Sequence, residues 1–140
     1  MLHKIRTFFR LLLLLGRRSK RPTGLVSLAK IRTAVVLRDA GDESLDRSIT
    51  DYFKKKGIEV RLLSIRDKRL RSREDLFVAI LEKTDFNERY AALSSTSCFK
   101  VGRRPFRGDV YDLVVSPAEG GDGSQRTVFE AITGYLERIR

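Results

Sequence analysis

Residues 76–102 read LFVAILEKTDFNERYAALSSTSCFKVG, and this stretch decides the fold class. Two short apolar runs flank an amphipathic decamer, which begins after the helix-start pair Thr84-Asp85. An apolar run, an amphipathic segment and a second apolar run are typical of a strand, a helix and a parallel strand. The sequence therefore predicts one βαβ unit at the centre of a small α/β domain.

The helix of this unit has a defined start in the sequence. Asp85 and Glu88 are spaced as in a capping box, so we expect the helix to begin at Phe86. Its expected buried face consists of Phe86, Tyr90 and Leu93, which recur at helical spacing. The strands predicted on either side cover residues 76–81 and 98–102.

The α/β pattern continues on both sides of this unit. Strands are predicted over residues 31–37, 58–65 and 110–115. Helices are predicted over residues 44–57, ended by Gly57, and over residues 125–139. Their expected buried stripes are Leu45, Ile49, Tyr52 and Phe53 in the first, and Val128, Phe129, Ile132, Tyr135, Leu136 and Ile139 in the second.

The last two strands are joined by a short connection. Only about seven residues, RRPFRGD, separate residues 98–102 from residues 110–115, which is too few for a helical crossover. Either the two strands are antiparallel, or one of them is a short edge strand.

These elements predict a three-layer, Rossmann-like or flavodoxin-like α/β sandwich of about five mostly parallel strands over residues 31–140. A basic N-terminal arm with a helix, residues 1–30, precedes it. A chain of 140 residues that is 41% hydrophobic fits one packed domain. The single cysteine, Cys98, excludes an internal disulfide, fits a reducing compartment and is expected to be an inert buried residue.

The net charge of +11 is concentrated at the N-terminus. Residues 1–32 contain nine Lys and Arg and no acid, whereas the rest of the chain contains 20 basic and 18 acidic residues. Such an arm either meets an anionic surface, which is nucleic acid or lipid headgroups, or docks on its own domain. The residues expected to bind the anionic surface are Lys4, Arg6, Arg10, Arg17, Arg18, Lys20 and Arg21.

The first 15 residues predict an amphipathic helix that ends in a run of five leucines. This run falls well short of the roughly 20 apolar residues that a membrane span needs. No small-residue cleavage site follows it, although an Arg-rich helix without acids also fits a mitochondrial presequence. Three further alternatives remain for this helix. It lies on the membrane surface, it packs on the α/β domain of its own chain, or it packs against a second copy in a homodimer. We favour the membrane over RNA because Phe8, Phe9 and the leucines supply an apolar face.

Catalytic motifs are missing from the sequence. No G-x-G-x-x-G and no G-x-x-x-x-G-K-[ST] occurs, and the only histidine is His3 in the arm. Asp39, Asp42 and Glu43 could bind Mg²⁺, but helix capping explains them more simply. Ser124 is expected to cap the last helix. We therefore expect no cofactor, no metal and no catalytic residue, and we identify no small-molecule substrate.

Residues 66–75, RDKRLRSRED, contain five basic and three acidic residues. They are expected to form an exposed, solvated connection with almost nothing to bury. The segment itself contains no aromatic side chain on which a nucleic-acid base could stack.

Several segments resemble a family of small α/β proteins of the Bacteroidota that has no established activity. The matching residues are 76–81, Ala92-Leu93-Ser94, Phe99-Lys100-Val101-Gly102 and Tyr111-Asp112-Leu113-Val114-Val115. The resemblance covers most of residues 30–140 and implies a bacterial cytoplasm. A weaker similarity, at the level of the fold, is to glycosyltransferases that modify lipopolysaccharide cores.

The sequence thus favours a non-catalytic binding or adaptor domain whose basic arm contacts a membrane or RNA. A reduced sugar- or nucleotide-transferring α/β enzyme is the alternative. The expected location is the cytoplasm, at the inner face of the membrane if the arm binds lipid.

Overall fold

The computed structural model of the chain describes residues 25–83, 86–106, 110–116 and 123–139. The seven arm residues expected to bind an anionic surface, and the predicted helix of residues 1–15, lie outside these ranges. Within the described part, five strands form one parallel sheet in the order β2-β1-β3-β4-β5. The predicted α/β class is therefore confirmed, and the sheet is parallel throughout rather than mostly so.

The elements follow the predicted order along the chain. The strands are β1 (Thr33–Leu37), β2 (Glu59–Leu63), β3 (Leu76–Ala79), β4 (Phe99–Gly102) and β5 (Leu113–Val114). The helices are the short 3₁₀ turn η1 (Leu28–Lys30), α2 (Glu43–Lys55), α3 (Phe86–Ser94) and α4 (Gln125–Arg138).

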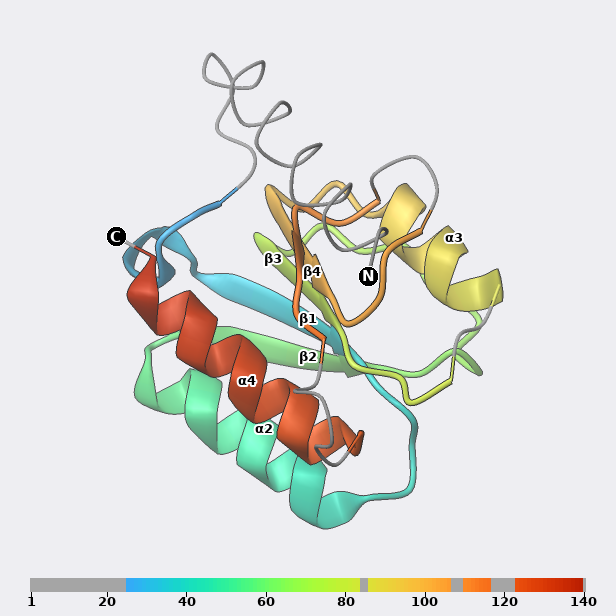
Figure 1. Cartoon of the computed structure of the whole chain (residues 1–140), viewed down its shortest axis with the longest axis horizontal. Coiled ribbons are helices and arrows are strands. Elements are labelled where there is room, and N and C mark those ends of the chain that lie inside the picture. The colour runs from blue at the N-terminus through green and yellow to red at the C-terminus, as the bar shows by residue number, and fades with distance from the viewer. Residues whose placement is uncertain (1–24, 84–85, 107–109, 117–122, 140) are drawn as a thin grey trace.

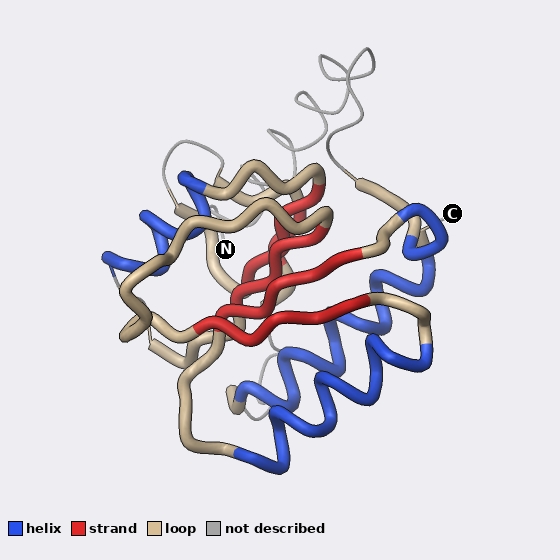
Figure 2. The backbone as a smooth tube through the Cα atoms, turned by 180° about the vertical axis from the view of Figure 1, so that it is seen from behind, coloured by secondary structure: helices blue, strands red, loops and turns tan. Residues whose placement is uncertain are grey.

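Helices cover the two faces of the sheet unequally. The two long helices, α2 and α4, lie side by side on one face, and the shorter α3 lies on the other (Figures 1 and 2). The first face carries a core that includes Ala34, Val36 and Val78 from the sheet. The opposite face carries a separate core around Val35, Phe77 and further buried side chains. Alternate residues of β1 thus enter different cores, as the pleat of a strand requires.

The predicted ends of α2 and α4 are confirmed. The Asp42 carboxylate accepts a hydrogen bond from the Leu45 amide at 3.0 Å, and the Ser124 hydroxyl accepts one from the Thr127 amide at 3.3 Å. Gly57 follows α2 with φ of 73°, a left-handed conformation that glycine adopts without a steric penalty. In α4, Tyr135 was predicted to be buried but is 48% exposed.

The face opposite α2 and α4 is covered partly by loops. After β2, the chain crosses this face through residues 64–75, which contain the buried Leu70 and Ser72. The carbonyl of Ser72 accepts a hydrogen bond from the Thr96 amide at 3.1 Å, which ties the crossing to the end of α3. Most of residues 66–75 are exposed, as predicted, but the prediction did not include the burial of Leu70 and Ser72.

The connection from β4 to β5 resolves the alternative left open by the sequence. The two strands are parallel, and β5 is a two-residue strand at the edge of the sheet. The Asp112 carboxylate accepts a hydrogen bond from the Lys100 amide at 2.9 Å, which holds the end of the connection against β4. Tyr111 lies against Gly102 so closely that a Cβ atom on Gly102 would overlap the Tyr111 ring. A buried aromatic ring therefore covers this part of the sheet.

Helix α3 begins at Phe86 as predicted, but its buried face was predicted wrongly. Phe86 is 81% exposed, Tyr90 46% and Leu93 55%. The buried residues of the helix are Glu88, Ala91 and Ala92. Small alanines let the helix lie close to the sheet, and Glu88 is buried because it has polar partners there. The partner that was predicted to complete the capping box, Asp85, lies outside the described residues.

The contact between Gly102 and Tyr111 predicts the effect of a single methyl group. Gly102→Ala should lower the free energy of unfolding by about 1–3 kcal/mol, because overpacking displaces the Tyr111 ring. Gly134→Ala is a matched control: nothing lies within 4 Å of its added Cβ in α4, and it should stabilise the protein by about 0.5–1 kcal/mol. Urea unfolding of both variants tests this, and equal effects would contradict the packing described.

Candidate functional site

The edge of the sheet at the carboxyl ends of the strands is the first place to look for a site. Doubly wound sheets with the strand order 2-1-3-4-5 bind ligands at the point where the order reverses, which here lies between β1 and β3. The segments that meet at this edge are residues 38–39, 80–82 and 103–104, together with the start of α4.

Two adjacent arginines after β4 occupy much of this edge. The Arg103 guanidinium donates to the carbonyls of Ile80 at 3.4 Å and Gly123 at 2.9 Å. The Arg104 guanidinium donates to the carbonyls of Leu81 at 2.8 Å and Glu82 at 2.7 Å. Burial, followed by the neighbouring Arg104 charge, lowers the pKa of Arg103, although a guanidinium stays charged at neutral pH. Both arginines therefore brace the ends of β3 and the start of α4.

The end of β1 is bound to the same edge. The amide of Asp39 donates to Gln125 Oε1 at 2.7 Å, and the Asp39 carboxylate accepts from the Glu82 amide at 3.1 Å. The Arg38 guanidinium donates two hydrogen bonds to the Asp46 carboxylate, at 2.8 and 3.0 Å. Among the described residues, the side chains of Arg38, Asp39, Arg103, Arg104 and Gln125 at this edge are thus engaged with the protein itself.

A buried polar cluster links α3 to the β4–β5 connection. The Tyr111 hydroxyl donates to Glu88 Oε2 at 3.1 Å, and Arg104 Nη1 lies 3.7 Å from Glu88 Oε1. Glu88 is only 1% exposed. Burial, followed by the nearby Glu88 carboxylate, raises the pKa of Tyr111 well above its ordinary value. These three side chains hold α3 on the sheet, and this positions the outer side of the helix.

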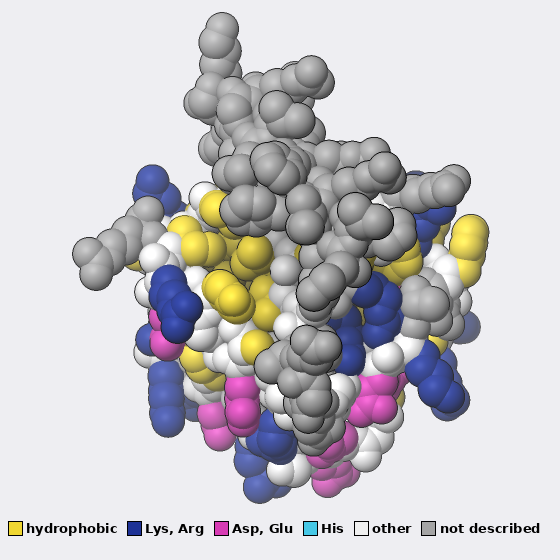
Figure 3. Space-filling view, viewed as in Figure 1, with side chains coloured by type: hydrophobic (Ala, Val, Ile, Leu, Met, Phe, Trp, Pro, Cys, Tyr) yellow, Lys and Arg dark blue, Asp and Glu magenta, His cyan; other side chains and the backbone are white. Residues whose placement is uncertain are grey.

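The outer side of α3 carries exposed apolar side chains. Phe86, Arg89, Tyr90, Leu93 and Ser94 line a shallow, open depression of about 440 Å³. Residues 68–71 pack beside it, because they share a second depression of about 350 Å³ with Tyr90. Figure 3 shows hydrophobic side chains beside Lys and Arg side chains at this end of the molecule. We define the α3 surface as Phe86, Arg89, Tyr90 and Leu93 together with Lys68, Arg69 and Arg71.

The charge of the α3 surface is positive. Among the described residues, no hydrogen bond or ion pair engages the side chains of Lys68, Arg69 or Arg71. The acids of the same loop are turned to other partners: the Asp67 carboxylate accepts from the Ser64 amide at 2.8 Å, and Glu74 pairs with Arg61 at 2.8 Å. The loop therefore exposes Lys68, Arg69 and Arg71, whereas the carboxylates of Asp67, which is also exposed, and Glu74 have partners within the protein.

The predicted metal and membrane properties can be compared with the described residues. Asp42 caps α2, and no cluster of three or more His, Cys, Asp or Glu suited to a metal occurs in the part of the chain that the structure describes. Within that part, no helix combines the length and apolar character that crossing a membrane requires. Cys98 is half-buried rather than buried.

Comparison with known proteins adds no assignment. No protein-family model, no curated protein and no solved structure matches the chain. The resemblance to a family of the Bacteroidota therefore stays a prediction.

Sequence reasoning missed the α3 surface. It assigned Phe86, Tyr90 and Leu93 to the core, and it interpreted residues 66–75 as a solvated connection that lacks an aromatic partner. The structure supplies that partner, Tyr90, from a helix about 20 residues further along the chain. A signal was present in the pair Ala91-Ala92, since small residues are suited to close packing of a helix on a sheet.

The raised pKa of Tyr111 predicts how stability depends on pH. A raised folded-state pKa contributes stability that is fully present below the unfolded tyrosine pKa of about 10, and that is lost as the pH rises toward the folded value. Wild-type protein should therefore lose stability between about pH 9 and pH 11, and Tyr111→Phe should lose less. At neutral pH the variant should be destabilised by about 1.5–3 kcal/mol, because Glu88 loses a donor.

Urea unfolding of both proteins at neutral and alkaline pH measures this difference. Parallel declines in the two proteins would contradict a role for Tyr111 in the alkaline transition.

Proposed function

We propose that this protein is a non-catalytic binding domain that docks on an anionic membrane surface through its basic arm and its α3 surface. The observation that carries the proposal is the α3 surface, where exposed Phe86, Tyr90 and Leu93 lie beside cations that have no partner among the described residues. Exposed apolar side chains beside Lys and Arg are typical of surfaces that lie at the boundary between headgroups and acyl chains. Docking of this kind places the protein at the inner face of the membrane.

Order-of-magnitude energies support this function. A Lys or Arg near an anionic bilayer contributes about 1 kcal/mol, so the four cations of the α3 surface contribute roughly 4 kcal/mol before ordering costs. Inserted apolar side chains add about 25 cal/mol per Å² removed from water. Neither contribution alone gives durable attachment, whereas the α3 surface and the arm together supply two signals, which stable membrane binding usually requires.

The sign of the charges favours lipid over the arm as the occupant of the α3 surface. Residues 1–21 contain seven cations and no acid, and the α3 surface is also basic. Packing the arm there would bring like charges together, whereas an anionic bilayer attracts both. RNA is the other anionic candidate, since Phe86 and Tyr90 can stack on bases, but exposed aliphatic Leu93 offers nothing to a base or a phosphate and favours lipid.

The first test removes the apolar contribution of the α3 surface. Phe86→Ala combined with Leu93→Ala should weaken binding to vesicles of phosphatidylserine and phosphatidylcholine by more than about tenfold, since roughly 1 kcal/mol is lost at each position. Vesicle flotation of the full chain measures this binding. Tyr135→Ala is a matched control, because Tyr135 is 48% exposed on α4, on the other face of the sheet. The proposal fails if the α3 double variant floats as well as the control does.

The second test removes the charge. Lys68→Glu, Arg69→Glu and Arg71→Glu together should abolish flotation at physiological salt, whereas Arg47→Glu with Lys55→Glu on α2 should reduce it only slightly. Wild-type binding should also fall as salt rises and should vanish on neutral vesicles. If the triple variant loses affinity for RNA but not for anionic vesicles, the anionic partner is a nucleic acid and the membrane proposal is wrong.

Deleting residues 1–21 tests the arm separately. If the arm and the α3 surface bind the same bilayer, removal of seven cations should weaken vesicle binding at least as strongly as the charge reversal on residues 68–71. Unchanged flotation of this deletion variant would show that the arm does not take part.

A further inference from the structure

Within the part of the chain that the structure describes, β2 is the longer of the two edge strands that have no partner on one side. β2 is the first strand in the spatial order and contains five residues, whereas β5 at the opposite edge contains two. The amide of Glu59 donates to Arg32 O, and Leu63 O accepts from the Arg38 amide, so the backbone groups of Glu59 and Leu63 face β1. Because these groups alternate along a strand, those of Val60 and Leu62 face away from the sheet. An exposed edge of this length is a template for pairing with another strand.

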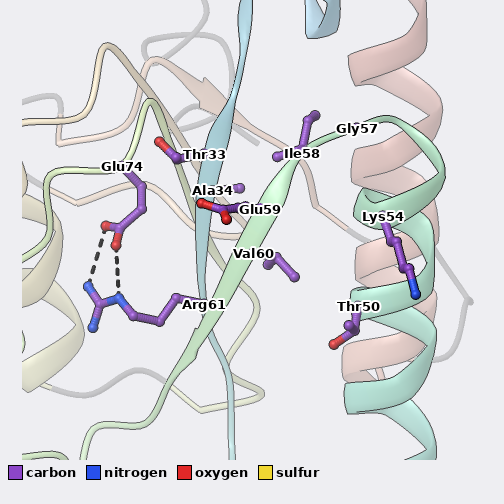
Figure 4. A pocket seen from close by; sticks show the side chains of 10 residues that line it. All are labelled: Thr33, Ala34, Thr50, Lys54, Gly57, Ile58, Glu59, Val60, Arg61 and Glu74. Carbon is purple, nitrogen blue, oxygen red and sulfur yellow. Dashed lines mark hydrogen bonds and ion pairs between the residues drawn. The ribbon is translucent and has the colours of Figure 1, made fainter.

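A groove runs beside this edge. It has a volume of about 600 Å³ and is lined by residues that include Ile58 and Val60 from the strand and Thr50 and Lys54 from α2. Figure 4 shows Val60 pointing toward α2, whereas Arg61 points to the opposite side of the strand and bonds to Glu74. The edge therefore has room for the side chains of an added strand, with an apolar side and a charged side.

The charged side has a self-complementary pattern. Glu59 and Arg61 lie two residues apart on the same face of β2, and both are exposed. No hydrogen bond or ion pair engages the Glu59 carboxylate among the described residues. Arg61 keeps 46% of its side chain exposed while it contacts Glu74, so it can accommodate a second carboxylate. An antiparallel copy of the same strand presents the two charges in reverse order.

We propose that two copies of this chain associate through β2, antiparallel, with Val60 opposite Val60. In this register Glu59 lies opposite Arg61 of the second copy, and the pair occurs twice across the two-fold axis. Val60 exchanges both of its backbone hydrogen bonds with Val60 of the second copy. The Leu62 amide donates to the Ile58 carbonyl of the second copy. The Ile58 amide takes no part because it already donates to Phe53 O at 2.9 Å.

The charges select this register over its neighbour. A shift that centres the pair on Arg61 would place Val60 opposite Leu62 and pair all of their outward backbone groups, whereas the proposed register leaves the Leu62 carbonyl without a donor from Ile58. The shift would, however, place the two Arg61 guanidinium groups directly opposite each other, and directly opposed like charges destabilise a strand pair. The Glu59 and Arg61 pattern therefore specifies both the partner, a second copy, and the alignment.

Charge exchange tests the proposal on the full chain. Light scattering over a range of concentrations should detect a dimer of the wild type, and Glu59→Arg should weaken it by more than about tenfold, because two attractive pairs become repulsive. Arg61→Glu should weaken it as well, and the double variant Glu59→Arg with Arg61→Glu should restore it. Glu130→Arg is the control, because Glu130 is an exposed acid on α4, and this variant should leave the dimer unchanged.

A second measurement follows the backbone. Hydrogen exchange at the Val60 and Leu62 amides should slow as the protein concentration rises and should stay fast in Glu59→Arg, even if that variant is otherwise folded. A chain that is monomeric at all concentrations overturns the proposal. A dimer that Glu59→Arg leaves intact, but that reversal of the arm charges dissociates, also overturns it and places the interface in the arm.

Discussion

The packing of Tyr111 on Gly102 is the contact on which one face of this fold depends. A parallel pair of strands is usually connected through a helix that covers the sheet. Here ten residues join β4 to β5, and the ring of Tyr111 covers this part of the sheet. It stacks on the ring of Phe77, and the two ring centres lie 6.4 Å apart. The ring fits because Gly102 has no side chain, and its hydroxyl extends to the buried Glu88 of α3. One aromatic residue thus joins the sheet, a loop and a helix.

The contact of Tyr111 with Glu88 helps to explain which side of α3 faces the solvent. Glu88 must point inward to meet Tyr111 and Arg104, and that orientation brings Ala91 and Ala92 onto the sheet. The three apolar side chains at the remaining positions are then turned to solvent. The exposed apolar surface thus goes together with a polar contact and with the packing of two alanines in the interior.

Most of the fold could be predicted from the sequence, because local signals determine it. The apolar runs of β1 and β3, the stripe of α2 and the Asp42 and Ser124 caps all lie within a few residues of the structure they specify. For the orientation of α3 the only local signal was the pair Ala91-Ala92, because the orientation depends on Tyr111 and Arg104, which are 23 and 16 positions away from Glu88. The proximity of residues 68–71 to Tyr90 is also a property of the tertiary fold. The candidate surface was therefore beyond reach of the sequence pattern, although the basic character of its loop was evident.

The alternation of side chains along β2 has a consequence for the orientation of a pair of molecules. If two copies join through this strand with both α2 helices on one face of the extended sheet, the two-fold axis must run perpendicular to the sheet. Both α3 surfaces then lie on the same side of the assembly, because α3 covers the face opposite α2 and α4. A flat target would meet the two surfaces together, and the second attachment would occur at the high effective concentration that the first creates. Retention would then rise much more steeply with protein concentration than the affinity of one copy allows.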